Sequence, residues 1–162
     1  MMKKWLALML SILATVAIAD TAAPVPPQYT PEQISACISK SSAQYQIHPH
    51  VVYAIAKWES NFNPGALGKP NKNGTQDHGI MQINDWWLDK VLWKYGIKKA
   101  DLYDACRNIE IGTWILAQCI QQHGQVWRAV GCYNARSIDK QDAYIKNVMA
   151  TFHKVRKQAG LQ

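Results

Sequence analysis

The placement of the cysteines constrains the fold of this chain more than any other feature of its sequence. All of them follow a start that has the pattern of an export signal: Cys37, Cys106, Cys119 and Cys132. In an oxidising compartment an even number of cysteines favours disulfides, and two disulfides leave three possible pairings. The chain has no C-x-x-C pair and no close cluster of His and Cys, so a zinc site has little support. We therefore expect a small domain with two cross-links.

Residues 1–19 predict a secretory signal peptide. The start MMKKWLALMLSILATVAIAD has two lysines, an apolar run, and the small residues Ala17-Ile18-Ala19 before Asp20, which is the order of a leader cleaved after Ala19. An uncleaved membrane anchor is the alternative, but the apolar run is short for a span of about 20 residues. The mature protein is expected to be periplasmic.

The charge of the mature chain suits an anionic partner. Loss of Lys3 and Lys4 with the leader reduces the 18 Lys and Arg to 16, against 11 Asp and Glu, which gives a formal charge of +5. Such a charge fits a cell-wall polymer, a nucleic acid or an anionic surface, and it equally fits a merely basic protein without such a partner. No block of lysines with interleaved aromatic residues is present, so a nucleic-acid role has little support.

The remainder of the 162 residues suits one domain. The Pro-rich residues 20–30 predict an extended tether, and residues 31–160 predict a single all-α domain with little β-structure. Thr30 and Gln33 form a capping box at the first helix start, and Asn84 and Asp104 are further N-cap candidates. Helical spacing and stop signals predict helices over 31–42, 49–59, 84–96, 104–124, 125–135 and 139–157. Residues 64–79 are rich in Gly, Asn, Pro and Lys, which predicts a long polar loop or a small hairpin.

One acidic residue stands at the end of an apolar helix. Glu59 lies between Trp58 and Ser60 in KWESNFNPGAL, just before the stop signal Asn63-Pro64-Gly65. A carboxyl group packed there against Trp58 and Phe62 would lose water, which raises its pKa and keeps it protonated, as a general acid requires. The alternative is a glutamate on the solvated face of the helix.

Two later stretches mix small residues with amides and a phenol. They are GIMQIN, residues 79–84, and VGCYNA, residues 130–135. Glycine permits close approach of the backbone, while Gln, Asn and Tyr side chains supply hydrogen bonds to hydroxyl-rich ligands. Together with Glu59 they indicate a sugar-binding groove.

These residues resemble a known family. AIAKWESNFNP, NGTQDHGIMQIN, WLDK with YGI, DACRNIEIGTWILAQC and WRAVGCYNA occur in the order seen in goose-type lysozyme-like lytic transglycosylases. The resemblance is strongest to the small specialised members associated with type III secretion, type IV pili and conjugation. It covers about residues 37–135 and continues more loosely into the last helix. It implies a lysozyme-like helical fold, peptidoglycan glycan strands as substrate and no cofactor. We further expect a monomer whose partners include components of a secretion, pilus or conjugation machine.

The resemblance also implies roles for individual residues. Glu59 matches the single catalytic glutamate, and Ser60 would support the sugar or orient Glu59. Residues expected to contact the glycan are Met81, Gln82, Tyr133 and Asn134, although Met81 and Tyr133 also fit a core role.

The expected reaction has no external water. Asn84 stands where goose-type hydrolases can carry an acid, and an amide there removes a water-activating base. The resemblance therefore favours formation of a 1,6-anhydro ring over hydrolysis, with the acetamide of the substrate in place of an enzyme nucleophile.

Asp77 leaves a two-acid mechanism open, and a second alternative is a protein without catalytic activity. Asp77 follows Glu59 by 18 positions, a separation similar to that of the two acids of animal lysozymes, and its carboxylate would stabilise positive charge at the anomeric carbon. A turn-forming aspartate is the simpler interpretation. A lysozyme-type hydrolase that uses Glu59 and Asp77, and a binding module without activity, therefore remain alternatives. Within this resemblance we hypothesise disulfides Cys37–Cys106 and Cys119–Cys132.

Overall fold

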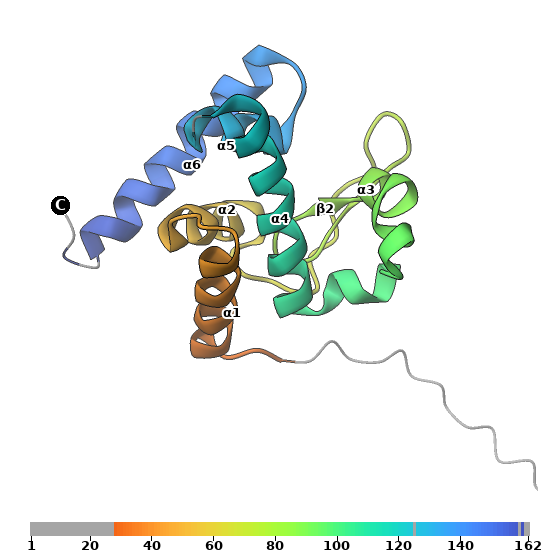
Figure 1. Cartoon of the computed structure of the whole chain (residues 1–162), viewed down its shortest axis with the longest axis horizontal. Coiled ribbons are helices and arrows are strands. Elements are labelled where there is room, and N and C mark those ends of the chain that lie inside the picture. Colours follow the sequence, from red (N-terminus) through yellow and green to blue (C-terminus); the bar gives the residue numbers. More distant parts are fainter. Residues whose placement is uncertain (1–27, 125, 159, 161–162) are drawn as a thin grey trace, which may run out of the picture.

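The computed structural model describes residues 28–124, 126–158 and 160 (Figure 1). The predicted signal peptide and most of the predicted tether lie outside the described residues. Ten elements follow in order: α1 (Pro31–Gln44), α2 (Pro49–Ser60), β1 (Asp77–His78), β2 (Ile83–Asn84), α3 (Asp85–Lys90), the 3-10 helices η1 (Leu92–Tyr95) and η2 (Lys99–Tyr103), α4 (Ala105–His123), α5 (Val126–Asn134) and α6 (Ile138–Gln158). The predicted all-α domain with minor β-structure is confirmed.

The helix starts follow from local side-chain chemistry. The Thr30 hydroxyl accepts a hydrogen bond from the Gln33 N–H, and the Gln33 side chain accepts one from the Thr30 N–H, so the capping box is present. Asn84 caps α3 and Asp104 caps α4 through bonds from Trp86 and Arg107 backbone N–H groups. These caps satisfy backbone donors that no helical carbonyl can reach.

The helix expected over 84–96 is wrong in its second half. Val91 has φ −129° and ψ −57°, which ends α3, and the chain continues as the separate 3-10 helix η1 up to Gly96. Leu92 is nonetheless buried at 2% exposure. The apolar spacing that predicted one helix therefore reports packing against the core rather than a continuous helix.

The helices pack around α4, which runs through the middle of the molecule in Figure 1. α1 and α5 both pack against α4, while α6 packs against α5 and also against α2. The core between them consists of fully buried apolar side chains that include Val52, Ile55, Ile80, Ile109, Leu116, Val130 and Val148. Because α6 contacts α2, the last turn of α2 lies beneath a helix that is far from it in sequence.

A buried amide fixes the turn between β1 and β2. Asn108 of α4 is fully buried; its Oδ1 accepts from the Met81 N–H at 2.8 Å, and its Nδ2 donates to the His78 and Leu102 carbonyls at 2.9 and 2.8 Å. Gly79 has φ +75°, and a Cβ there would lie 2.1 Å from the Leu102 carbonyl oxygen. No other residue fits this position without displacing backbone. The hairpin that follows is thus held at a defined place beside α4.

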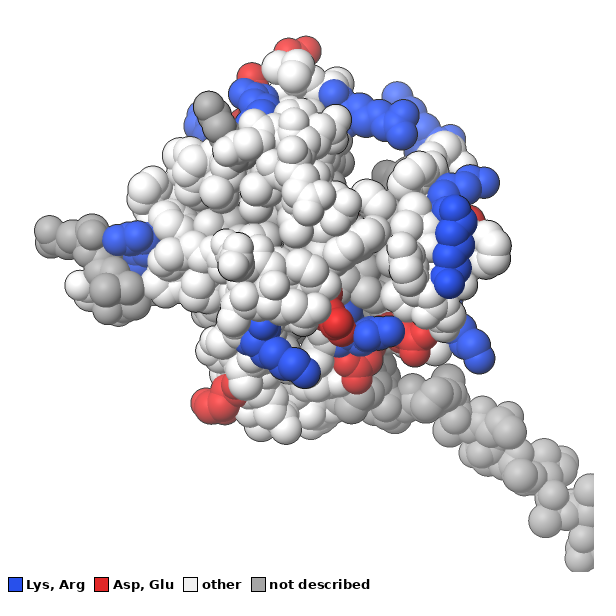
Figure 2. Space-filling model, in the orientation of Figure 1, with Lys and Arg blue, Asp and Glu red and all other residues white. Residues whose placement is uncertain are grey.

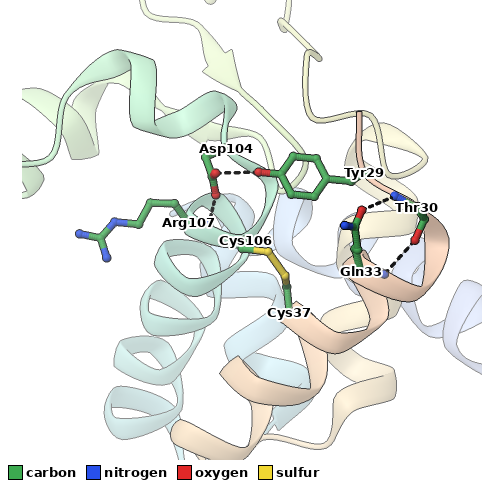
Figure 3. Close-up of a disulfide and its surroundings, with 7 residues drawn as sticks. All are labelled: Tyr29, Thr30, Gln33, Cys37, Asp104, Cys106 and Arg107. Atoms are coloured by element: carbon green, nitrogen blue, oxygen red, sulfur yellow. Dashed lines mark hydrogen bonds between the residues drawn. A yellow bond between two sulfur atoms is a disulfide. The ribbon is translucent and has the colours of Figure 1, made fainter. Parts of the chain in front are cut away.

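The structure has the hypothesised disulfides, Cys37–Cys106 and Cys119–Cys132. The first joins α1 to the start of α4 (Figure 3), where the Tyr29 hydroxyl also donates to the Asp104 carboxylate at 2.6 Å. The second joins α4 to α5. Both links therefore tie neighbouring helices to the central one.

No helix among the described residues is both long and apolar enough to cross a membrane.

Candidate active site

A cavity of about 380 Å³ opens at the end of α2, between the β1–β2 hairpin and α5. Two carboxyl groups, a phenol and several amides reach it from four elements. Its lining includes Glu59, Asp77, Gln82, Ile83, Asn84, Trp86, Trp87, Ile115, Tyr133, Asn134 and Lys140. The residues that sequence motifs placed far apart are therefore brought together at one site.

Glu59 has the properties of a neutral acid. It lies in the last turn of α2, which ends at Ser60 with Asn61 in the left-handed conformation. Burial raises its pKa to about 7, a hydrogen bond donated by the Tyr144 hydroxyl to Oε1 opposes the rise, and the charge of Asp77 adds to it. Loss of water disfavours the ionised carboxylate, so a large fraction of Glu59 carries its proton at neutral pH.

The surroundings of Glu59 differ from those expected. Trp58 is 46% exposed, and Phe62 packs its ring edge-on against Tyr53 with centroids 4.6 Å apart. Neither aromatic lines the cavity. Trp58 precedes Glu59 by one residue, so the two side chains point to different sides of α2. The raised pKa was predicted correctly, but tyrosines from α5 and α6 surround the carboxyl group instead.

Tyr133 closes the site from α5. Its hydroxyl donates to the Met81 carbonyl at 2.7 Å. Burial raises its pKa well above the usual value, and the nearby charges of Glu59 and Asp77 add to the rise. The phenol therefore stays protonated and cannot serve as a base at neutral pH.

Asp77 faces the same cavity from β1. In the antiparallel register Asp77 lies opposite Asn84 of β2. The Asn84 Nδ2 donates to one carboxylate oxygen of Asp77 at 2.7 Å, and the Asn71 Nδ2 donates to the other at 3.4 Å. These amides orient the carboxylate of Asp77, which lines the cavity together with Glu59.

Two residues that were expected to contact or support the sugar, Met81 and Ser60, do not line the cavity. Met81 is fully buried, and its Sδ lies 2.7 Å from where a Cβ on Gly112 would be. Its predicted contact with glycan is therefore wrong, and its side chain packs the core. The Ser60 hydroxyl donates to the Ile80 carbonyl at 2.8 Å and does not line the cavity. Ser60 thus ties the catalytic helix end to the GIMQIN turn.

Gln82 and Asn134 do line the cavity. Gln82 has φ +50°, and its Nε2 donates to the Gly79 carbonyl at 2.9 Å, which supports this unusual backbone conformation. Asn134 is exposed at the end of α5. Both amides are in reach of a ligand in the cavity.

Tyr144 is a hydrogen-bond partner of Glu59 that the sequence did not predict. It is 5% exposed, lies on α6 and donates its hydroxyl hydrogen bond to Glu59. Burial raises its pKa well above the usual value, with a further rise from the charge of Glu59. The only sequence signal was a tyrosine on the apolar face of the last helix, and this signal does not distinguish a core residue from a partner of Glu59.

The arrangement suits acid catalysis on a bridging oxygen. A carboxyl group with a raised pKa and a second carboxyl group line one cavity, with several amides and the Tyr133 phenol to hold a polar ligand. Within the described ranges no group of three His, Cys, Asp or Glu residues could hold a metal ion.

Comparison with known proteins agrees with this geometry. The model of the transglycosylase SLT domain family matches residues 36–152. The invasion protein IagB of Salmonella typhimurium is 35% identical over 125 residues, which are 74% of this chain and 77% of the relative. The protein IpgF of Shigella flexneri is 36% identical over 106 residues, which are 65% of this chain and 68% of the relative.

A solved structure shows the same fold. An inactive mutant of the lytic transglycosylase Slt from Pseudomonas aeruginosa superposes with a TM-score of 0.64 at 19% identity. The match covers 82% of this chain and 25% of the solved chain. This chain therefore corresponds to about a quarter of that larger protein.

Proposed function

The chain belongs to the transglycosylase SLT domain family and is a lytic transglycosylase, and from this premise we propose the chemistry of its site. It cleaves the β-1,4 bond between N-acetylmuramic acid and N-acetylglucosamine in peptidoglycan and leaves a 1,6-anhydro end. The observation that carries this proposal is Glu59, which burial keeps largely protonated with a pKa of about 7, in a cavity lined by amides and the Tyr133 phenol.

In the first step Glu59 acts as an acid. Its carboxyl proton passes to the glycosidic oxygen, and the bond from that oxygen to the anomeric carbon of the muramic acid breaks. The oxygen of the 2-acetamido group of the same sugar bonds to the anomeric carbon in its place. Asp77 lines the same cavity, where its carboxylate accepts a hydrogen bond from the Asn84 amide, and it stabilises the positive charge that develops on the sugar.

In the second step Glu59 acts as a base. The carboxylate accepts the proton of the muramoyl O6 hydroxyl, and O6 bonds to the anomeric carbon while the bond to the acetamide oxygen breaks. This closes the 1,6-anhydro ring, restores the proton on Glu59 and consumes no water. Tyr144 helps the alternation, because its hydrogen bond stabilises the ionised form of Glu59 between the two steps.

Hydrolysis is the second candidate, and Asp77 is the observation that favours it. Glu59 and Asp77 line one cavity, as two acids do in hydrolases of this kind. Asn84 carries an amide, which cannot serve as a base to activate water. Its Nδ2 donates to Asp77 and Thr75, and its Oδ1 accepts from the Trp86 N–H. We therefore favour ring closure. A binding module without activity would not need an acid with a raised pKa at this place.

The masses of the products separate these candidates. Purified sacculi digested by the full chain are expected to release muropeptides that are lighter by one water molecule than reducing muropeptides. Reducing muropeptides would favour hydrolysis, and the absence of soluble products would favour a binding module.

The cellular role is proposed from the leader pattern and from the relatives. The leader pattern of residues 1–19 supports export to the periplasm, where the described domain would meet peptidoglycan. Similarity to a protein named as an invasion protein supports local opening of the cell wall for a secretion, pilus or conjugation machine.

The pH profile of kcat/KM is expected to report the raised pKa of Glu59. The free enzyme is active with Glu59 protonated, so kcat/KM should fall above about pH 7, roughly tenfold per pH unit. Turbidity loss of sacculi at constant ionic strength measures it. A fall centred between pH 4 and 5, where an ordinary glutamate titrates, would contradict the assignment of the acid.

Replacement of Tyr144 by phenylalanine is expected to shift the fall of kcat/KM, the alkaline limb of the pH profile, to higher pH. The Tyr144 hydrogen bond lowers the pKa of Glu59, so its loss leaves burial and Asp77 unopposed. We expect kcat at pH 7 to fall about tenfold, because the ionised form that follows the first step loses a donor. A lower rate with an unshifted limb would mean that the tyrosine acts through packing alone.

A further inference from the structure

A second cavity of about 1320 Å³ continues from the catalytic one. Asn84, Trp86, Trp87, Tyr133 and Lys140 line both cavities, so the two are parts of one groove. A ligand cleaved at Glu59 therefore extends into the larger part.

The two parts of the groove differ in charge. Glu59 and Asp77 line only the smaller cavity. Among the described residues the lining of the larger cavity contains no Asp or Glu, but it contains three cations: Lys72, Arg136 and Lys140. On the face in Figure 2, Lys and Arg side chains gather at the upper right, where the upper helices face the α3 region. The larger part of the groove is thus suited to a ligand that carries negative charge.

The buried side chain of Gln141 holds the turn that carries Arg136. Gln141 is 5% exposed, and its Nε2 donates to the Ala135 carbonyl at 2.9 Å, while Arg128 donates to its Oε1 at 3.3 Å. Gly131 permits this contact, since a Cβ there would lie 2.8 Å from the Cβ of Gln141. A buried amide with partners on both sides gives this turn one conformation.

Lys140 has a defined relation to the catalytic centre. It precedes Tyr144 by four residues on α6, and residues at that spacing share one face of a helix. Tyr144 reaches Glu59, so Lys140 extends from the same face one turn farther along the groove. No ion pair of Arg136 or Lys140 occurs among the described residues.

Aromatic rings also line the groove. Trp86 is 41% exposed, and Trp87 packs edge-on against Trp86 and Trp114 with centroids 5.1 and 5.9 Å apart. These edge-on contacts hold the rings in place, and Trp86 and Trp87 leave apolar surface toward the groove. Such a surface fits the apolar face of a sugar ring and leaves the substituents of that ring directed to other walls.

From this arrangement we propose that Arg136 and Lys140 bind carboxylates on the lactyl-peptide arm of muramic acid. The proposal rests on the proposed function, since it concerns the same groove and substrate. Trp86 and Trp87 hold the sugar ring, and the arm on its lactyl oxygen reaches the cationic wall. The site therefore selects charged muramic acid strands over neutral amino-sugar polymers with the same backbone.

Two sources supply this carboxylate chemistry. In strands with stem peptides the lactyl group is an amide, and the carboxylates belong to the peptide. In strands without stems the lactyl group itself ends in a carboxylate. Both cations are exposed, so each contact is screened by salt and contributes modestly.

Binding to soluble oligosaccharides tests the proposal without turnover. The full chain with Glu59→Gln is the parent, and calorimetry gives its Kd for three ligands. These are a peptide-bearing tetrasaccharide, the same tetrasaccharide after an amidase has removed the stems, and neutral chitotetraose. The test variant adds Arg136→Gln and Lys140→Gln, and the control adds Lys146→Gln and Lys154→Gln. The control removes the same charge from exposed positions of α6 that line neither part of the groove.

We expect the test variant to bind the peptide-bearing ligand about tenfold more weakly at low salt, with the control within about twofold of the parent. Chitotetraose should bind both alike. A loss that remains without stems assigns the contact to the lactyl carboxylate, and a loss that disappears assigns it to the peptide. Equal affinities of the test variant and the parent for both charged ligands would overturn the proposal, as would an equal loss for chitotetraose.

These results are independent of the reaction chemistry. If the wild-type chain releases no anhydro products while the charge-dependent binding is present, the proposed function fails and the anion site stands. If anhydro products appear and the charge-dependent binding does not, the anion site fails alone. Thermal unfolding of parent, test variant and control at one pH confirms that all three are folded.

Discussion

Replacement of Glu59 by glutamine is expected to lower the rate of peptidoglycan cleavage by about 10³-fold or more. Glutamine has nearly the shape of glutamate, but it cannot give a proton to the glycosidic oxygen and then accept one from O6. General acid and base contributions are each worth about 10² to 10⁴-fold. The initial rate of turbidity loss of sacculi, together with product analysis over long incubation, measures the effect.

The fold should survive this change. The carboxyl group already favours its neutral form, so a neutral amide in its place leaves no new buried charge. Glu32→Gln is the matched control, because Glu32 is exposed in the first turn of α1 and remote from the groove. A folded Glu59→Gln protein that binds sacculi and keeps a tenth or more of the wild-type rate would refute the assignment.

Replacement of Asp77 by asparagine is expected to reduce kcat more than tenfold, a change of at least about 1.4 kcal/mol in the barrier, and the products should remain anhydro-muropeptides. In the proposed reaction the carboxylate would face positive charge on the sugar, and electrostatic contributions of this kind reach about 3 to 4 kcal/mol. The pH limb should also move down, because the charge of Asp77 raises the pKa of Glu59. Initial rates across pH measure both effects.

Asparagine can replace Asp77 in the turn but removes the carboxylate, so the substitution separates a structural role from a catalytic one. Asparagine forms local hydrogen bonds and tolerates the same backbone geometry. Asp89→Asn is the control, since Asp89 is exposed on α3 and does not line the groove. If Asp77→Asn retained the wild-type rate and pH limb, Asp77 would be a structural residue of the hairpin.

Local chemistry made much of the fold predictable. Thr30, Asn84 and Asp104 each cap the helix that the sequence assigned to them. Gly124 ends α4 in the left-handed conformation, as its position after the apolar stripe predicted. These signals act within a few residues, so no knowledge of the tertiary structure is needed to interpret them.

The surroundings of the catalytic residue were not predictable in the same way. Tyr144 contacts Glu59 across 85 residues, and that contact depends on how α6 packs against α2. The position of Trp58 next to Glu59 predicts that its ring packs against the carboxyl group. Helix geometry instead directs this ring toward solvent. Met81 was assigned to the groove by its motif, whereas Asn108 holds its backbone so that the side chain enters the core.

In the proposed reaction Glu59 closes an anhydro ring without water. Digestion of sacculi by the full wild-type chain in water enriched with heavy oxygen tests it directly, with mass spectrometry of the released muropeptides. We predict anhydro-muropeptides that carry no heavy oxygen, and no such products from the Glu59→Gln chain. Reducing muropeptides with one heavy oxygen at the new end would contradict the claim and establish hydrolysis.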